Sequence, residues 1–147
     1  MNNTNNKTSS DLLKKGYNSN ELFDIFSLAL LKYDLEEYKA ALDIVNGLLY
    51  LNPDFIDCYY LKLASYLGLK EYQKLYDYAD RLLINNPDDI KIKLLKITAY
   101  IKDSRYLEAG TELGEISDNY SDLLQANLNE SRFFKLLLKM FSVESKH

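Results

Sequence analysis

The sequence predicts an all-α protein built from tandem helix-turn-helix repeats. Tyr38, Tyr72 and Tyr106 stand 34 residues apart, and Pro53 and Pro87 repeat the same interval. Further columns keep this phase, namely Leu48, Leu82 and Ile116, then Val45, Ala79 and Leu113, and also Ala41 and Ala109. The chain has only 5 glycines and 2 prolines in 147 residues, whereas turn-rich sheet folds generally use more of both.

A 34-residue period of this kind resembles the tetratricopeptide repeat, a helix-turn-helix unit. The resemblance implies three tandem repeats in a right-handed superhelix with a C-terminal capping helix. We therefore expect a disordered or weakly helical tail over residues 1–19, a three-repeat domain over 20–120, and the capping helix with its tail over 121–147.

The individual helices follow from apolar spacing. Phe23, Phe26, Leu30 and Tyr33 recur at i, i+3, i+7 and i+10, which predicts a first helix over about 21–33 with Asn20 as its N-cap. Further helices are expected near 36–51, 55–68, 71–85, 88–102 and 105–117. Pro53 and Pro87 then fall just past the second helix of a pair, where a missing N–H is tolerated.

Two segments depart from the simple pattern. Asn46-Gly47 suggests a turn when taken alone, but the period places it inside a helix, where the glycine costs about 1 kcal/mol relative to alanine. The segment 133–141, FFKLLLKMF, is apolar around more than one face. Apolar residues from Leu123 to Phe141 predict one or two further helices, which are expected to cap the array. The candidates for a second interface in this segment are Phe133, Phe134, Leu137 and Phe141.

Composition excludes several classes of protein. A formal charge of −4 argues against nucleic-acid binding, which depends on clustered Lys and Arg. A small basic cluster is interpreted as a solvated helix face; it consists of Lys91, Lys93, Lys96, Lys102 and Arg105. No run approaches 18 apolar residues, so no membrane span is expected. With one cysteine and no apolar stretch at the N-terminus, a cytoplasmic location is expected.

Residues that carry catalytic or metal chemistry are scarce. The single histidine is the last residue, His147, so neither Cys58 nor any serine has a positioned imidazole base. One His and one Cys satisfy no zinc spacing, and the scattered glycines form no phosphate-binding loop. The acidic pairs Glu36-Glu37 and Asp88-Asp89 lie at expected helix starts, where carboxylates are favourable. We expect a non-enzyme without cofactor or metal.

Repeat arrays of this type recognise proteins, and their first helices line a concave groove that holds an extended peptide or a partner helix. The expected groove residues are Phe26, Leu30, Tyr33, Asp57, Tyr60, Ala64, Leu67, Leu94, Thr98 and Ile101. Groove and core remain equal alternatives for Phe26 and Tyr33. The wall lacks the Lys and Arg set that grips an acidic chain terminus, so a carboxylate-clamp adaptor is not expected.

A narrower resemblance covers residues 22–117. The segments LFDIFSLALLKY, LEEYKAALDIVNGLLYLN and RYLEAGTELGEIS resemble the class II chaperones of bacterial type III secretion translocators. The resemblance implies pockets for a client segment at Phe26, Leu30, Tyr33, Tyr38 and Leu51. The chain departs from that family where LKLASYLGL replaces a glycine-containing pattern, and where the N-terminal dimer-forming segment is shortened to DLLKKG.

Two functional hypotheses follow. The first is a cytoplasmic chaperone that holds an apolar segment of a secreted protein or peptide client in its groove. The second is a scaffold or assembly subunit of a larger complex, whose main contact is the C-terminal FFKLLLKMF surface. A homodimer and a hetero-complex both remain open.

Overall fold

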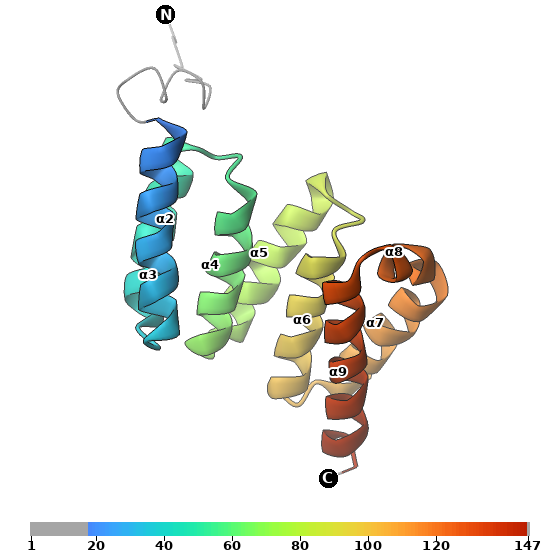
Figure 1. The fold of residues 1–147 in the computed structure, drawn as a ribbon. Helices are drawn as coiled ribbons and strands as arrows, with labels where there is room; N and C mark the ends of the chain where they lie inside the picture. The colour runs from blue at the N-terminus through green and yellow to red at the C-terminus, as the bar shows by residue number, and fades with distance from the viewer. Residues whose placement is uncertain (1–17, 147) are drawn as a thin grey trace, which may run out of the picture. The chain divides into compact units, whose positions relative to one another are not determined.

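The computed structural model describes residues 18–146, and helices are the regular secondary structure of that range (Figure 1). They are α2 (Ser19–Asp34), α3 (Tyr38–Leu51), α4 (Ile56–Gly68), α5 (Tyr72–Asn85), α6 (Ile90–Lys102), α7 (Tyr106–Asn119), α8 (Ser121–Ala126) and α9 (Leu128–Glu144). The all-α prediction is confirmed, and the first six helices lie close to the expected ranges. Residues 1–17 of the expected disordered or weakly helical tail, and His147, lie outside the described residues.

The 34-residue period is visible in the backbone. Tyr38, Tyr72 and Tyr106 are each the first residue of a helix. Two residues before each tyrosine is a non-glycine residue in the left-handed conformation, namely Glu36, Lys70 and Ser104, with φ of 60°, 58° and 58°. The turn between the first and second helix of a pair therefore recurs with the sequence period.

The N-cap of α2 is Asn18, so the prediction of Asn20 was wrong by one half-turn. The Glu21 amide donates to Asn18 Oδ1 at 2.9 Å, and the Asn18 amide donates to Glu21 Oε2 at 3.0 Å. These reciprocal bonds form a capping box, which satisfies two amides that would otherwise lack partners at the helix start. The N-x-x-E spacing that signals the box is present in the sequence.

The chain divides into two compact units at the boundary between Leu69 and Lys70. Unit one comprises the described residues up to 69, with α2, α3 and α4, and unit two comprises those from 70 onward, with α5 to α9. A three-repeat domain was expected over 20–120, and the boundary between the two units falls inside its second repeat.

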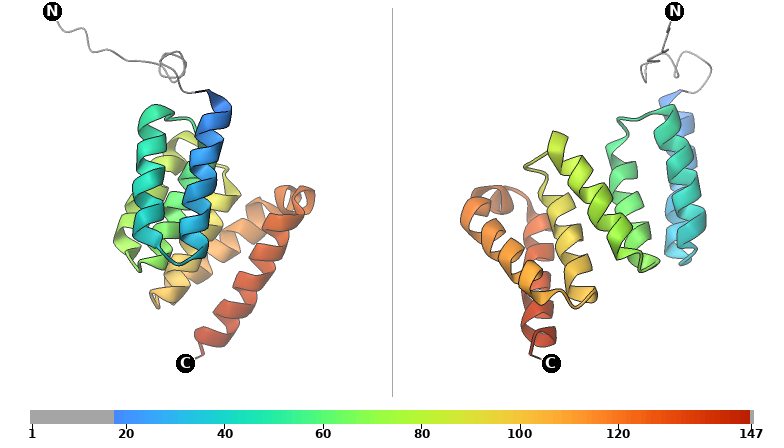
Figure 2. Two further views of the ribbon diagram at one scale, coloured as in Figure 1. Left: turned by 60° about the vertical axis from the view of Figure 1, so that its left-hand side comes forward. Right: turned by 180° about the vertical axis from the view of Figure 1, so that it is seen from behind.

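Unit one is a three-helix core in which α3 packs against both α2 and α4. Figure 2 shows α2 and α3 side by side. One apolar cluster joins the three helices; its buried members are Leu22, Phe26, Ala29, Val45, Leu48, Phe55, Cys58 and Leu61. These residues recur at helical spacing along each element, so a single apolar stripe per helix is enough to build the core.

Unit two is organised around α6, which packs against α5, α7 and α9. Eight residues of α6 are buried, and they are drawn from several sides of the helix. From α9, Phe134 and Leu137 are buried with them. A helix surrounded in this way is apolar all round, as IKIKLLKITAYIK is apart from its lysines.

Two glycines of unit one give a matched test of this packing. A Cβ at Gly68 would lie 2.6 to 2.7 Å from ring atoms of Tyr38, whereas a Cβ at Gly47 would meet nothing within 4 Å. We expect Gly68→Ala to destabilise the protein by about 1 to 3 kcal/mol through overpacking. Gly47→Ala should stabilise it by up to about 1 kcal/mol through helix propensity.

Urea unfolding followed by circular dichroism measures both effects. The packing account is contradicted if the two alanine variants shift the unfolding midpoint in the same direction.

Candidate functional site

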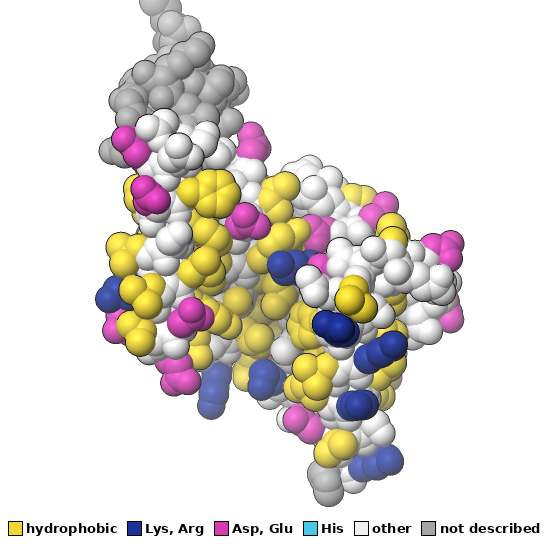
Figure 3. Space-filling model, in the orientation of Figure 1, with side chains coloured by type: hydrophobic (Ala, Val, Ile, Leu, Met, Phe, Trp, Pro, Cys, Tyr) yellow, Lys and Arg dark blue, Asp and Glu magenta, His cyan; other side chains and the backbone are white. Residues whose placement is uncertain are grey.

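The described surface of unit one exposes large apolar side chains on α2 and α4. Phe23 and Leu30 of α2 are 54% and 40% exposed, and Ile56 of α4 is 53% exposed. Figure 3 shows hydrophobic side chains gathered over α2. A pocket of about 280 Å³ opens at the N-terminal end of α2, and its lining includes Leu22, Phe23, Phe55, Ile56 and Asp57.

Three phenylalanines define this end of the unit. The Phe23 and Phe55 ring centroids are 5.4 Å apart, and those of Phe26 and Phe55 are 5.2 Å apart. Phe26 is only 8% exposed and belongs to the core cluster, so the structure places it in the core rather than in a groove. Phe23, which the site prediction omitted, supplies the exposed aromatic surface.

The opposite end of α2 carries a second aromatic pair. The Tyr33 and Tyr38 rings meet edge to face with centroids 5.3 Å apart, and Tyr38 lies against Gly68. Both tyrosines are half-buried, and Tyr33 packs against the core cluster. Among the other predicted groove residues of unit one, Leu30 is exposed, and the half-buried ones are Leu51, Tyr60, Ala64 and Leu67.

The predicted groove residues of unit two are not on the surface. Leu94 and Ile101 are fully buried, and Thr98 is 7% exposed, with its hydroxyl donating to the Leu94 carbonyl at 2.8 Å. All three lie on α6, which packs against α5, α7 and α9. These residues belong to the core of unit two, and their placement in an open groove was wrong.

The proposed second interface on α9 is also partly internal. Phe134 and Leu137 are buried, and Phe133 and Phe141 are half-buried. The large apolar residues that α9 leaves exposed are Leu128, Leu136, Leu138 and Val143. The segment is apolar on several faces because one face joins the core and others remain at the surface.

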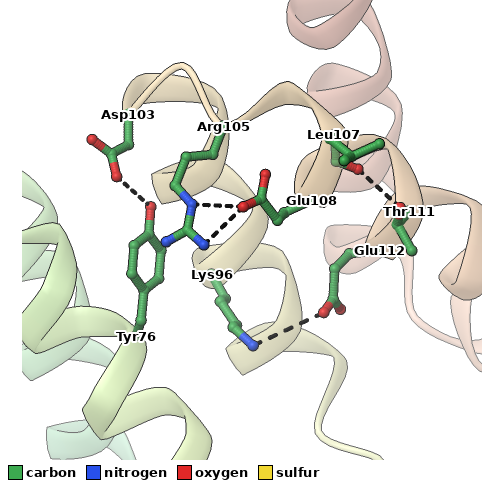
Figure 4. A network of polar contacts seen from close by, with 8 residues as sticks. All are labelled: Tyr76, Lys96, Asp103, Arg105, Leu107, Glu108, Thr111 and Glu112. Carbon is green, nitrogen blue, oxygen red and sulfur yellow. Dashed lines mark hydrogen bonds and ion pairs between the residues drawn. The ribbon is translucent and has the colours of Figure 1, made fainter.

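A polar network joins α5, α6 and α7 inside unit two (Figure 4). The Tyr76 hydroxyl donates to Asp103 Oδ2 at 3.0 Å, and the Tyr76 ring stacks on Tyr100 with centroids 4.7 Å apart. The Arg105 guanidinium lies 4.9 Å from the Tyr76 ring centroid and forms a 2.8 Å ion pair with Glu108. Burial, and then the hydrogen bond to Asp103, raise the pKa of Tyr76.

Lys96 belongs to the same side of unit two, and its side chain is only 12% exposed. Its ammonium group lies 2.8 Å from Asp80 Oδ1 and 3.9 Å from Glu112 Oε1. Burial lowers the pKa of Lys96, but its hydrogen bonds to Asp80 and Tyr100 outweigh burial and leave the pKa raised. The interpretation of the basic cluster as a solvated face was therefore wrong for Lys96. The Arg105 side chain lies over the Tyr76 and Tyr100 rings but keeps 39% exposure.

The network consists of ion pairs and packed aromatic rings, and its ionised groups pair with one another. Within residues 18–146, no group of three or more potential metal ligands is close enough to hold an ion. Cys58 is fully buried, and burial followed by the charge of Asp57 raises the pKa of its thiol to about 12. A thiol in that state is a poor nucleophile, because the thiolate is the reactive form.

Comparison with protein-family models, with curated protein sequences and with solved structures finds no match. Among the described helices, none is both long and apolar enough to cross a membrane. The function of the site is therefore inferred from the geometry of this chain.

Removing the Tyr76 hydroxyl tests the polar network. We expect Tyr76→Phe to destabilise the protein by about 1 to 2 kcal/mol, because Asp103 loses a hydrogen bond while the ring still stacks on Tyr100. Tyr50→Phe is the matched control, since Tyr50 is largely exposed. Equal unfolding midpoints for the two variants in urea would show that the Asp103 bond contributes nothing.

Titration of Cys58 gives the expected dependence of stability on pH. The thiol has a pKa near 9.0 when unfolded and about 12 when folded, so its contribution is complete below pH 9 and is lost between about pH 9 and pH 12. Raising the pH from 8 to 10 should therefore lower the free energy of unfolding more in the wild type than in Cys58→Ala. Urea titrations at both pH values measure the difference, and an equal loss in the two proteins would contradict the assignment.

Proposed function

We propose that this chain is a non-enzymatic protein-binding module of the tetratricopeptide type, which holds an apolar segment of a partner protein on unit one. The observation that carries the proposal is the exposed apolar surface of α2 and α4, where Phe23 and Ile56 line a pocket and Leu30 is exposed further along α2. Exposed apolar surface that is continuous with a pocket is typical of a recognition site.

The recurring helix pairs support the repeat assignment. The helix starts and the left-handed turn residues both repeat at the period typical of tetratricopeptide repeats, and three such pairs span residues 19–119. Proteins of this type bind extended segments through spaced apolar pockets. The two aromatic groups at opposite ends of α2, around Phe23 and Tyr33, provide two such contact points on one helix.

The more specific proposal is a cytoplasmic chaperone that keeps a secreted client soluble by covering its apolar segments. It rests on the resemblance of residues 22–117 to class II translocator chaperones. Of the residues to which that resemblance assigns pockets, Leu30, Tyr33, Tyr38 and Leu51 keep exposed surface, and Phe23 takes the place of Phe26.

The alternative is a scaffold subunit that joins a larger complex through α9. The exposed Leu136, Leu138 and Val143 favour it. Deleting the chain after residue 129 is a poor test of this alternative, because Phe134 and Leu137 would leave the core of unit two. Substituting exposed residues of α9 separates the two functions without removing core residues.

The test compares three pairs of surface substitutions, on α2, on α9 and at control positions. We expect Phe23→Ser/Leu30→Ser to weaken client binding by about 2 kcal/mol, or about 30-fold, because exposed anchors are lost while the core is unchanged. The control is Ile84→Ser/Leu107→Ser, which removes two exposed apolar residues of unit two.

Affinity capture from the native cell, with mass spectrometry, identifies the client, and calorimetry measures its affinity for each variant. A single secreted, partly hydrophobic client that the α2 variant loses and the control retains supports the chaperone. A set of complex subunits that the α2 variant retains and Leu136→Ser/Leu138→Ser loses supports the scaffold and overturns the chaperone.

A further inference from the structure

The outer side of α2 carries an apolar stripe that its own unit leaves uncovered. Leu28, Leu31 and Leu35 are each about half exposed. With exposed Asp24 they follow the spacing i, i+4, i+7 and i+11, which places Asp24, Leu28 and Leu31 along one line of the helix and Leu35, its C-cap, at the end of that line. Phe23, by contrast, contacts Phe55 at the start of α4, so the stripe and the proposed client surface are different sides of α2.

The outer side of α9 has a stripe with the same spacing. Arg132, Leu136, Lys139 and Val143 stand at i, i+4, i+7 and i+11, and all four are exposed. Leu136 and Val143 are each more than half exposed. The buried face of α9, with Phe134 and Leu137, is a different side of the helix.

The two stripes are complementary when their helices are aligned in parallel. Asp24 is then opposite Arg132, Leu28 opposite Leu136, and Leu35 opposite Val143. Leu31 is opposite Lys139, whose aliphatic stem covers apolar surface while its ammonium group stays in water. Alternating intervals of four and three residues are the spacing with which two α-helices pack along a shared seam.

The charges of the surrounding surfaces agree with this pairing. Residues 18–69 contain eight acidic side chains and three basic ones, whereas the exposed charged residues of α9 are all basic, namely Arg132, Lys135 and Lys139. Opposite potentials favour the encounter of the two surfaces and fix their register.

We propose that the outer face of α9 in one copy of this chain packs in parallel against the outer face of α2 in a second copy. Each copy has both faces, so the contact either closes reciprocally into a dimer or continues from copy to copy. This self-association uses a different side of α2 from the proposed client surface and does not depend on the proposed function.

Sedimentation equilibrium of the full chain over a range of concentrations tests the proposal. We expect a mass that rises with concentration, and an association that weakens as NaCl increases because the charges are screened. Leu28→Gln and Leu136→Gln should each raise the dissociation constant about tenfold or more, since each removes half of an apolar contact. Leu107→Gln, at a strongly exposed position outside both stripes, should leave it unchanged.

A charge exchange tests the register. Asp24→Arg and Arg132→Asp should each weaken association, because each places like charges opposite one another. Both changes in one chain should restore it, and so should an equimolar mixture of the two single variants. The control is Lys70→Glu/Lys102→Glu, which alters exposed charges outside α9.

Three results would overturn the proposal. They are a monomeric mass at every concentration, an association that neither glutamine variant weakens, and a double charge variant that associates as weakly as the weaker of the two single variants.

A second experiment measures binding of the protein to vesicles of phosphatidylserine and phosphatidylcholine. Binding to them that Leu136→Gln abolishes, in a protein that stays monomeric, would assign the α9 face to an anionic membrane surface instead.

Discussion

The left-handed turn between paired helices is the constraint on which each unit depends. After α2, the Glu36 amide donates to the Tyr33 carbonyl, and the Glu37 amide donates to the Lys32 carbonyl, both at 2.9 Å. After α6, Ser104 and Arg105 make the same bonds to Ile101 and Tyr100. This hydrogen-bond pattern closes the helix and reverses the chain within a few residues. It holds a non-glycine residue in a conformation that costs about 1 to 2 kcal/mol.

Because this turn recurs, the sequence period predicted the helix limits well. In each repeat the left-handed residue stands two positions before the tyrosine that begins the second helix. Because this spacing is the same in all three repeats, the helix boundaries recur at the same positions of the period. Local signals worked less well at the start of α2. Asn18 and Asn20 are both competent N-caps, and only the position of Glu21 three residues after Asn18 distinguishes them.

The site was harder to predict, because a single sequence shows which residues share a helix face but not which helix covers that face. Phe23 and Phe26 both lie toward the Phe55 ring, yet one is exposed and the other buried. Leu94 and Ile101 have the spacing of groove residues, but they are buried on α6, which packs against α5, α7 and α9. The apolar pattern of FFKLLLKMF predicted a helix that caps the array, but it did not indicate which helices it would pack against.

The two units use their polar groups differently, and this difference bears on function. In unit two, Tyr76 donates a hydrogen bond to Asp103, and Lys96 and Arg105 form ion pairs with Asp80 and Glu108 respectively. These polar groups stabilise the packing of α5, α6 and α7. In unit one, α2 is apolar on its core side and exposes leucines and a phenylalanine on other sides. Large exposed apolar side chains favour association when they lie on one ordered helix, since no folding entropy remains to be lost there. We therefore place both proposed contacts on α2, one to a client and one to a second copy, on separate sides of the helix.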